Sequence, residues 1–244
     1  MCAQTSCHCL PVDYKIPAMA DRHTLITFDV YSALFDIESS LVPPVKTALG
    51  ADGDALELVR NWRRKQMEWV LISNSLGGAR LTFESITRRA LDDSLARARR
   101  NLPEPVRADL AAVWRTLRPW PEAAPVLQEV KDRGYVVGWL SNGDEAMLRA
   151  LLPLLPPVVD HVFSTEQAGH YKPHPSVYAL PLRALRLKAS DVLHVAGSIT
   201  DVIGAKAAGL PCVWSNRRRE PLPDPGNPPD AQVADLSGLL PILG

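Results

Sequence analysis

Three short apolar segments, each followed by polar or small residues, limit the folds open to this chain. They cover Leu25–Phe28, residues 135–140 and Val192–Ala196, and segments of helical character separate them. A short, near-continuous apolar run fits a strand that is buried on both faces of a parallel sheet. Strands that alternate with helices favour a parallel sheet with right-handed crossovers. The sequence therefore predicts an α/β fold whose ligands bind beyond the carboxyl ends of the strands.

A long stretch without strand signals lies between the first two apolar segments. From about residue 54 to residue 118, apolar side chains recur at helical spacing. The first helix of this stretch is expected to place four of them on one face: Leu58, Trp62, Trp69 and Leu76. Thr82 is suited to cap a second helix. We expect residues 39–118 to form an all-helical cap domain, inserted into a core domain of residues 24–38 and 119–244.

The composition is that of an ordinary globular protein without a strong charge. The 244 residues include 27 basic and 27 acidic side chains, and 46% are hydrophobic. A formal net charge of +0 gives no electrostatic reason to expect nucleic acid or a membrane as a partner. No apolar run approaches the length of a membrane span. With four cysteines and no pattern of a disulfide framework, we expect a cytoplasmic protein.

Three of the four cysteines gather at the N-terminus. They are Cys2, Cys7 and Cys9, with His8 between two of them, and thiolates with imidazole bind zinc. No second pair of ligands follows at zinc-finger spacing, and chain ends are usually poorly ordered. We therefore expect residues 1–23 to be a flexible extension, and we expect Cys212 to be a small buried side chain.

Two carboxylates and a lysine are the candidate reactive groups. Asp29 follows the first apolar segment directly, and Asp201 lies shortly after the third. A carboxylate is a usable nucleophile when it is held near its target, and a lysine beside it keeps it ionised. Lys172 stands in a proline-rich loop and is the candidate for that cation. Asp201 would hold the lysine or orient a water molecule, and it would equally serve as a helix cap.

Ser141 and Asn142 end the second apolar segment. Their side chains and nearby backbone N–H groups suit a carboxylate or another anion. A plain Ser-Asn-Gly turn explains the same residues, and on their own they do not decide between the two interpretations.

Four segments in order, around Asp29, Ser141, Lys172 and Asp201, resemble the motifs of the haloacid dehalogenase superfamily. The resemblance runs from about residue 25 to residue 216. It implies a haloacid dehalogenase-like Rossmannoid core, a parallel sheet with helices on both faces, and an inserted helical cap.

Within that superfamily, the chain is most similar to the (S)-2-haloacid dehalogenases. Most members of the superfamily are Mg²⁺-dependent phosphatases, which carry Asp-x-Asp at the first motif. Here Tyr31 stands two residues after Asp29, where those enzymes have the second aspartate. In the cap, Trp62 to Trp69 resembles the dehalogenase helix whose arginine receives the leaving group, which is Arg63 by position. The resemblance places further residues around the substrate: Val30, Tyr31, Ser141, Asn142, Tyr178 and Ser198.

The resemblance implies a hydrolase that needs no metal or cofactor and acts on a small carboxylic acid. Asp29 would displace the halide of a 2-haloacid and form an ester, which water then cleaves to give a 2-hydroxy acid. Arg63, Lys172 and Asp201 would complete the catalytic set. Family members are often dimers, and the cap around Trp69 and Leu76 is our hypothesis for an interface in a homodimer.

Two motifs depart from the dehalogenase pattern. The usual Asp-x-Tyr-Gly-Thr becomes Asp-Val-Tyr-Ser-Ala, which brings in Ser32 and Ala33, and the usual Ser-Asn-x-Trp-Asp becomes Gly-Ser-Ile-Thr-Asp at residues 197–201. An altered leaving-group pocket also fits a C–N hydrolase such as azetidine-2-carboxylate hydrolase. A Mg²⁺ phosphatase and a non-catalytic binding protein on the same fold are the remaining alternatives.

Overall fold

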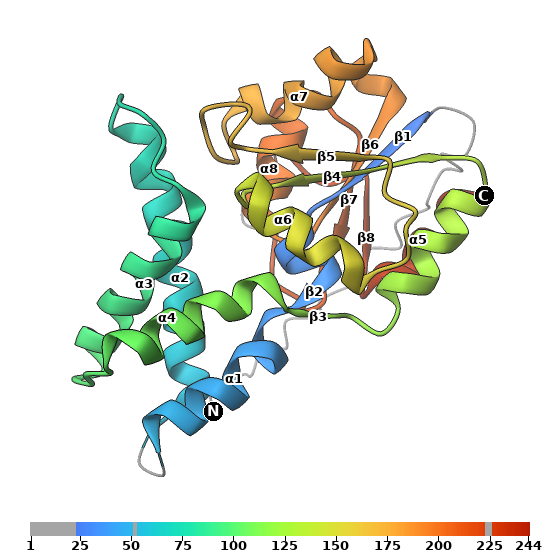
Figure 1. The fold of residues 1–244 in the computed structure, drawn as a ribbon. Helices are drawn as coiled ribbons and strands as arrows, with labels where there is room; N and C mark the ends of the chain where they lie inside the picture. The colour runs from blue at the N-terminus through green and yellow to red at the C-terminus, as the bar shows by residue number, and fades with distance from the viewer. Residues whose placement is uncertain (1–22, 51–52, 223–225) are drawn as a thin grey trace, which may run out of the picture.

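The computed structural model describes residues 23–50, 53–222 and 226–244 (Figure 1). The N-terminal cysteines and the predicted extension lie outside these residues, apart from His23. Among the described residues, no helix has both the length and the apolar character needed to cross a bilayer.

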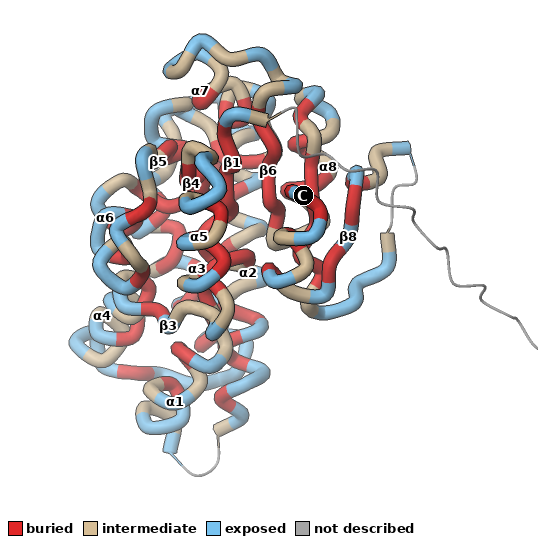
Figure 2. The backbone as a smooth tube through the Cα atoms, turned by 90° about the vertical axis from the view of Figure 1, so that its right-hand side faces the viewer, coloured by how far each residue is buried: buried red, intermediate tan, exposed pale blue. Residues whose placement is uncertain are grey.

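A six-stranded sheet forms the centre of the molecule. Its strands run in the spatial order β5-β4-β1-β6-β7-β8, and all neighbouring pairs are parallel. The bounds are β1 Leu25–Phe28, β4 Val136–Ser141, β5 His161–Ser164, β6 Val192–Ala196, β7 Cys212–Ser215 and β8 Ala231–Val233. β1 lies between β4 and β6 and is completely buried, as the red segments of Figure 2 show. The predicted α/β fold with a parallel sheet is confirmed.

Helices cover both faces of this sheet. On one face, α5 (Ala123–Asp132) and α6 (Glu145–Leu151) pack on the sheet, and Ile26 and Phe28 of β1 belong to the apolar layer on this face. The other face packs under α7 (Pro175–Leu185) and α8 (Ile199–Ala207). Alternate residues of a strand face opposite sides, so each central strand contributes to both apolar layers. Cys212 is completely buried in β7, as expected.

Three details of the core are not what the sequence pattern suggests. Helix α7 continues through Pro181, although a proline usually interrupts a helix. Helix α8 begins at Ile199 after the N-cap Ser198, so Asp201 lies in its first turn and is not its cap. Strand β8 was not expected, and Leu236–Leu239 after it packs on the core.

The helical insertion lies between two short strands that pair with each other, β2 (Phe35–Asp36) and β3 (Arg118–Pro119). Its helices are α1 Ile37–Leu49, α2 Ala55–Ser75, α3 Phe83–Arg97 and α4 Glu104–Ala112. In Figure 1 these helices stand beside the sheet and its covering helices. Helix α1, which contains Pro43 and Pro44, was not expected.

Helix α2 carries the largest apolar contact of the insertion. Trp62 is completely buried, and its indole Nε1 donates to the carbonyl of Thr87 in α3 at 2.8 Å. Thr82 caps α3 as predicted, accepting from the backbone N–H of Ser85. Leu76 follows the last residue of α2 and is 65% exposed, so it does not share the buried surface of Leu58 and Trp62.

Buried polar contacts join the insertion to the core at one place. Arg80 pairs with Asp144 at 2.6 Å, and both side chains are largely buried. The side chain of Asn74 donates to the carbonyl of Tyr171 at 2.9 Å and accepts from its backbone N–H at 2.8 Å. Since Tyr171 precedes Lys172 in the chain, this contact positions the loop that carries the candidate lysine. We call these four residues the cap–core clamp.

Candidate active site

Asp29 lies at the carboxyl end of β1, where the chain leaves the centre of the sheet. Its backbone N–H still donates to Val195 of β6 at 2.9 Å. One wide helical turn, Val30–Leu34, follows, and the N–H of Ser32 donates to Oδ2 of Asp29 at 3.1 Å. This hydrogen bond fixes the carboxylate and leaves Oδ1 to face Lys172. The side chain keeps 12% of its surface exposed.

Lys172 lies between the two candidate carboxylates. Its Nζ is 3.3 Å from Oδ1 of Asp29 and 2.9 Å from Oδ2 of Asp201. The Lys172 side chain is only 4% exposed, as is that of Asp201. Residues that are 143 and 29 positions away from Lys172 in the chain therefore meet it at one point. The three catalytic candidates of the core lie together, as the sequence predicted.

The electrostatics keep this group charged. Burial by itself lowers the pKa of Lys172, but the carboxylates of Asp201 and Asp29 outweigh it and raise that pKa above its ordinary value. Burial by itself raises the pKa of Asp201, but Lys172 and His194 outweigh it and hold that pKa well below the usual range. A buried charge persists only when it is paired and hydrogen-bonded, and both conditions are met here.

Tyr178 and Asn142 form hydrogen bonds with members of this group. The Tyr178 hydroxyl donates to Oδ1 of Asp201 at 2.8 Å, and burial together with that carboxylate raises the pKa of Tyr178 well above its ordinary value. The side-chain oxygen of Asn142 accepts from the backbone N–H of Lys172 at 3.0 Å. Ser141 is completely buried, and its hydroxyl accepts from the N–H of Gly143. Tyr178 is thus placed to orient Asp201, and Asn142 is placed to orient Lys172.

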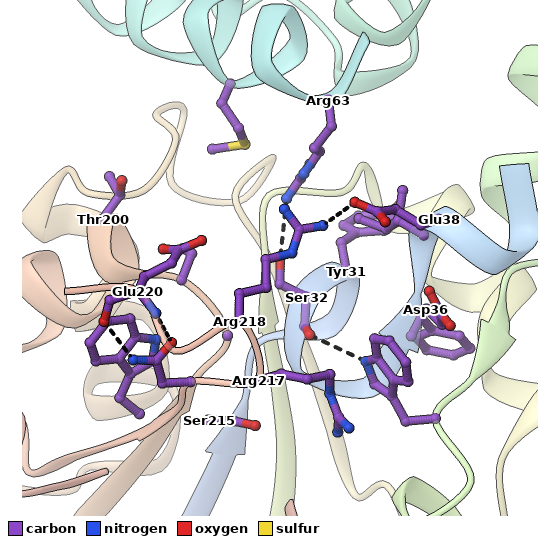
Figure 3. A pocket seen from close by; sticks show the side chains of 18 of the residues that line it. Tyr31, Ser32, Asp36, Glu38, Arg63, Thr200, Ser215, Arg217, Arg218 and Glu220 are labelled. Carbon is purple, nitrogen blue, oxygen red and sulfur yellow. Dashed lines mark hydrogen bonds and ion pairs between the residues drawn. The ribbon is translucent and has the colours of Figure 1, made fainter. Parts of the chain in front are cut away.

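A cleft of about 800 Å³ opens between the cap and the core (Figure 3). Its lining includes the predicted residues Tyr31, Arg63 and Ser198, whereas Val30, Ser141, Asn142 and Tyr178 do not reach it. Asp29 is not part of the lining either, but Ser32, which binds its carboxylate, is. The carboxylate therefore lies just below the floor of the cleft.

Arg63 reaches across the cleft from α2. Its Nη2 lies 3.4 Å from the hydroxyl of Ser32, and its Nη1 donates to the side chain of Gln66 at 2.5 Å. The guanidinium also stands 5.8 Å from the ring centroid of Trp114. Its two side-chain hydrogen bonds are to neutral groups, so the cation is available to an anion in the cleft.

Gly197 lets the first and last motifs approach closely. A Cβ atom at this position would lie 2.4 Å from the backbone N of Ala33 and 2.6 Å from the carbonyl carbon of Ser32. We expect Gly197→Ala to destabilise the fold by about 1–3 kcal/mol and to lower turnover, because the backbone beside Asp29 has to move. Thermal unfolding and kcat are measured against Gly78→Ala, where an added Cβ meets nothing within 4 Å. Equal effects of the two changes would contradict this account.

The comparisons with known proteins agree with this geometry. A family model described as haloacid dehalogenase-like hydrolase matches residues 23–209. The chain belongs to the haloacid dehalogenase-like hydrolases. An (S)-2-haloacid dehalogenase of Pseudomonas sp. strain YL is 31% identical to this hydrolase over 217 residues, 88% of this chain and 92% of the relative. The (S)-2-haloacid dehalogenase 4A of Burkholderia cepacia is 30% identical over 92% of this chain and 96% of its own length.

Solved structures extend the similarity to the whole fold. An L-2-haloacid dehalogenase has a TM-score of 0.85 to this hydrolase at 29% identity and covers 91% of this chain and 98% of its own. The enzyme of Xanthobacter autotrophicus with chloropropionic acid covalently bound has a TM-score of 0.80 at 28% identity and covers the same shares.

Groups that could hold a metal ion are scarce around this site. In the described parts of the chain, no three His, Cys, Asp or Glu side chains lie close enough together to hold a metal ion. Tyr31 occupies the position of the second phosphatase aspartate, and the Asp201 carboxylate already accepts from Lys172, His194 and Tyr178. This donor set does not fit Mg²⁺, which requires several oxygen ligands in octahedral geometry.

Sequence reasoning missed one member of the buried group. His194, in the middle of β6, is completely buried, and its Nε2 lies 2.9 Å from Oδ2 of Asp201. A single histidine inside an apolar strand resembles an ordinary core residue. The one signal that could have found it is its place on the strand that leads to Asp201, seven residues further along the chain.

Proposed function

We propose that this hydrolase cleaves the carbon–halogen bond of a small 2-halocarboxylic acid, with Asp29 as the nucleophile. The observation that carries the proposal is the buried group of Asp29, Lys172 and Asp201 directly below a cleft that contains the cation of Arg63. The relatives named as (S)-2-haloacid dehalogenases supply the substrate class. The comparisons name no C–N hydrolase, so that alternative is not favoured.

The first step is a displacement at carbon. A carboxylate oxygen of Asp29 attacks the α-carbon of the substrate, a C–O bond forms as the carbon–halogen bond breaks, and halide leaves with both bonding electrons. Attack from the side opposite the halide inverts the configuration. Lys172 places a positive charge 3.3 Å from the Asp29 carboxylate, and Arg63 receives the departing anion or pairs with the substrate carboxylate.

The second step is hydrolysis of the ester. Water adds to the side-chain carbonyl carbon of Asp29, the ester C–O bond breaks, and the 2-hydroxy acid leaves with a proton from water. One proton is released overall, together with the halide. Lys172 and Asp201 lie beside the carbonyl, where they orient the water and stabilise the charge that develops. The solved relative with covalently bound chloropropionic acid supports a covalent route.

The predicted domain division completes this proposal. We propose that residues 39–118 act as a cap over the core of residues 24–38 and 119–244, and that Arg63 is the cap's contribution to the reaction. Closure of such a cap excludes bulk water from the ester. The homodimer stays a hypothesis: Trp69 is half-buried and bonds to Asp93, whereas Leu71 and Leu76 are exposed.

The test combines halide release with isotope labelling. Repeated turnover of (S)-2-chloropropionate in ¹⁸O-water should release chloride and place ¹⁸O in the peptide that contains Asp29, since water attacks the aspartyl carbonyl. Excess chelator should leave the rate unchanged, because no step uses a metal. Label in the product alone, with none in the peptide, would contradict the ester.

A further inference from the structure

His194 is a buried titratable residue that the two-step reaction above does not use. Its side chain is completely buried on β6, and both ring nitrogens have partners. Nε2 lies 2.9 Å from Oδ2 of Asp201, and Nδ1 lies 2.9 Å from the hydroxyl of Thr27 on β1. Thr27 is completely buried as well. A row of hydrogen bonds thus runs from the centre of the sheet to the candidate catalytic carboxylate.

The chemistry of the partners fixes the direction of these hydrogen bonds. An ionised carboxylate only accepts, so Nε2 of His194 carries the hydrogen that points at Asp201. In the neutral ring Nδ1 is then an acceptor, and the hydroxyl of Thr27 donates to it. The alternative tautomer would place two acceptors 2.9 Å apart inside the core, which is costly.

The hydrogen bond from His194 completes the set that holds Asp201. Oδ1 accepts from Tyr178, and Oδ2 accepts from both Lys172 and His194. The ammonium of Lys172 lies between the two carboxylates, so it also reaches the nucleophile, Asp29. A rotation of the Asp201 carboxylate would therefore carry Lys172 away from Asp29.

The surroundings of the ring are otherwise apolar or already paired. Tyr178 from α7 meets the imidazole edge-on at 5.9 Å between centroids, and Cys212 of β7 is its partner in the strand register. Both are buried, and the pKa of each is raised well above its ordinary value, by burial first and by the carboxylate of Asp201. Both are therefore neutral beside the ring at neutral pH.

We propose that His194 is a positioning residue, whose Nε2–H holds the Asp201 carboxylate in the orientation that places Lys172 beside Asp29. The role in turnover rests on the proposed function, whereas the hydrogen bond itself does not. A small displacement of a positioned group lowers rates by one to two orders of magnitude, so loss of this hydrogen bond should cost about 10–100-fold in kcat.

Three variants separate this role from simple packing. His194→Phe keeps a ring of similar size but removes the donor, and His194→Gln keeps an N–H donor within reach of Asp201. The double variant Thr27→Val/His194→Phe also replaces the Thr27 hydroxyl, whose remaining acceptor would be the carbonyl of Leu193 at 3.5 Å, so it is expected to fold even if His194→Phe alone does not. We expect kcat to fall about 10–100-fold in both Phe variants and less than about 5-fold in His194→Gln, with KM changed less than about 2-fold.

A spectroscopic measurement tests the hydrogen bond without any substrate. In ¹⁵N NMR of the imidazole, the wild-type protein should show the neutral tautomer or the imidazolium, each with a hydrogen on Nε2. A neutral ring with its hydrogen on Nδ1 would overturn the proposal. So would equal kcat values for His194→Phe and the wild type. Wild-type inactivity towards all 2-haloacids, together with the expected NMR signature, would instead reject the proposed function and leave the hydrogen bond in place.

Discussion

Replacing Asp29 by Asn is expected to reduce dehalogenation by at least about 10⁴-fold. The amide has the size and hydrogen-bonding reach of the carboxylate, but it is a very weak nucleophile towards carbon. The protein should still fold, because the Asn side-chain oxygen can accept from the N–H of Ser32 as Asp29 does at 3.1 Å. Halide release under saturating 2-chloropropionate measures the loss.

The control for this variant is another aspartate changed in the same way. Asp54 caps α2 by accepting from the N–H of Glu57 at 2.9 Å, and Asn is an equally good N-cap residue. Asp54→Asn should therefore keep full activity. Appreciable turnover by a freshly prepared Asp29→Asn protein would show that another group attacks the substrate.

Replacing Lys172 by Met is expected to lower both activity and stability. Turnover should fall about 10²–10³-fold, because the cation 3.3 Å from Asp29 is lost and the charge that develops in the reaction loses its partner. The free energy of unfolding should fall by about 3–5 kcal/mol at neutral pH, since two carboxylates remain buried without a counter-charge. Urea unfolding and kcat are measured for the same preparation.

The loss of stability in Lys172→Met should depend on pH in a specific direction. In the native protein the pKa of Asp201 is lowered, so its contribution to stability is present above the ordinary pKa of about 4 and is lost as the pH falls further. The pKa of Lys172 is raised, so its contribution is present below about 10.4 and is lost as the pH rises through the raised value. In Lys172→Met the Asp201 carboxyl loses the cation that lowers its pKa, so it takes up a proton more readily. The difference in unfolding free energy between the wild type and Lys172→Met should thus become smaller as the pH falls below about 5.

Lys206→Met is the matched control for Lys172→Met. Lys206 pairs with Asp230 at 2.7 Å near the surface, and such pairs contribute about 1 kcal/mol or less. A deficit of the same size in both variants, or one that grows towards acid pH in Lys172→Met, would contradict the buried charge triad.

The strongly patterned parts of the fold could be predicted from the sequence. Strands β1 and β6 have the predicted bounds, because each is a mainly apolar run that is followed by polar or small residues. Helix α1 was missed because Pro43 and Pro44 remove two backbone donors, a pattern that is typical of a helix end or a loop. Strand β8 was missed because three residues after a proline-rich loop carry little pattern, and only its pairing with β7 defines it.

The site could be predicted in part. The order of the motifs around Asp29, Lys172 and Asp201 anticipated that these side chains meet. Their surroundings depend on distances between segments far apart in the chain, which no local pattern encodes. The contact of His194 with Thr27 joins positions 167 residues apart. The need for a glycine at Gly197 is evident only from the backbone of Ala33, which leaves no room for a Cβ atom.

We expect the cap–core clamp to influence how the cleft opens. On its side of the cleft, Arg80 and Asp144 pair with side chains that are only 7% and 13% exposed, and Asn74 is bonded twice to Tyr171. On the opposite side, Arg218 and Arg60 both pair with Glu38, and both arginines are more than half exposed.

Salt screens the exposed pairs of Glu38 far more than the buried pair of the clamp. If the cap rotates, we expect its axis to lie near Tyr171 and the exposed contacts of Glu38 to be disturbed before those of the clamp. We therefore expect ionic strength to affect access to the cleft more than it affects the loop of Lys172, which lies next to the clamp.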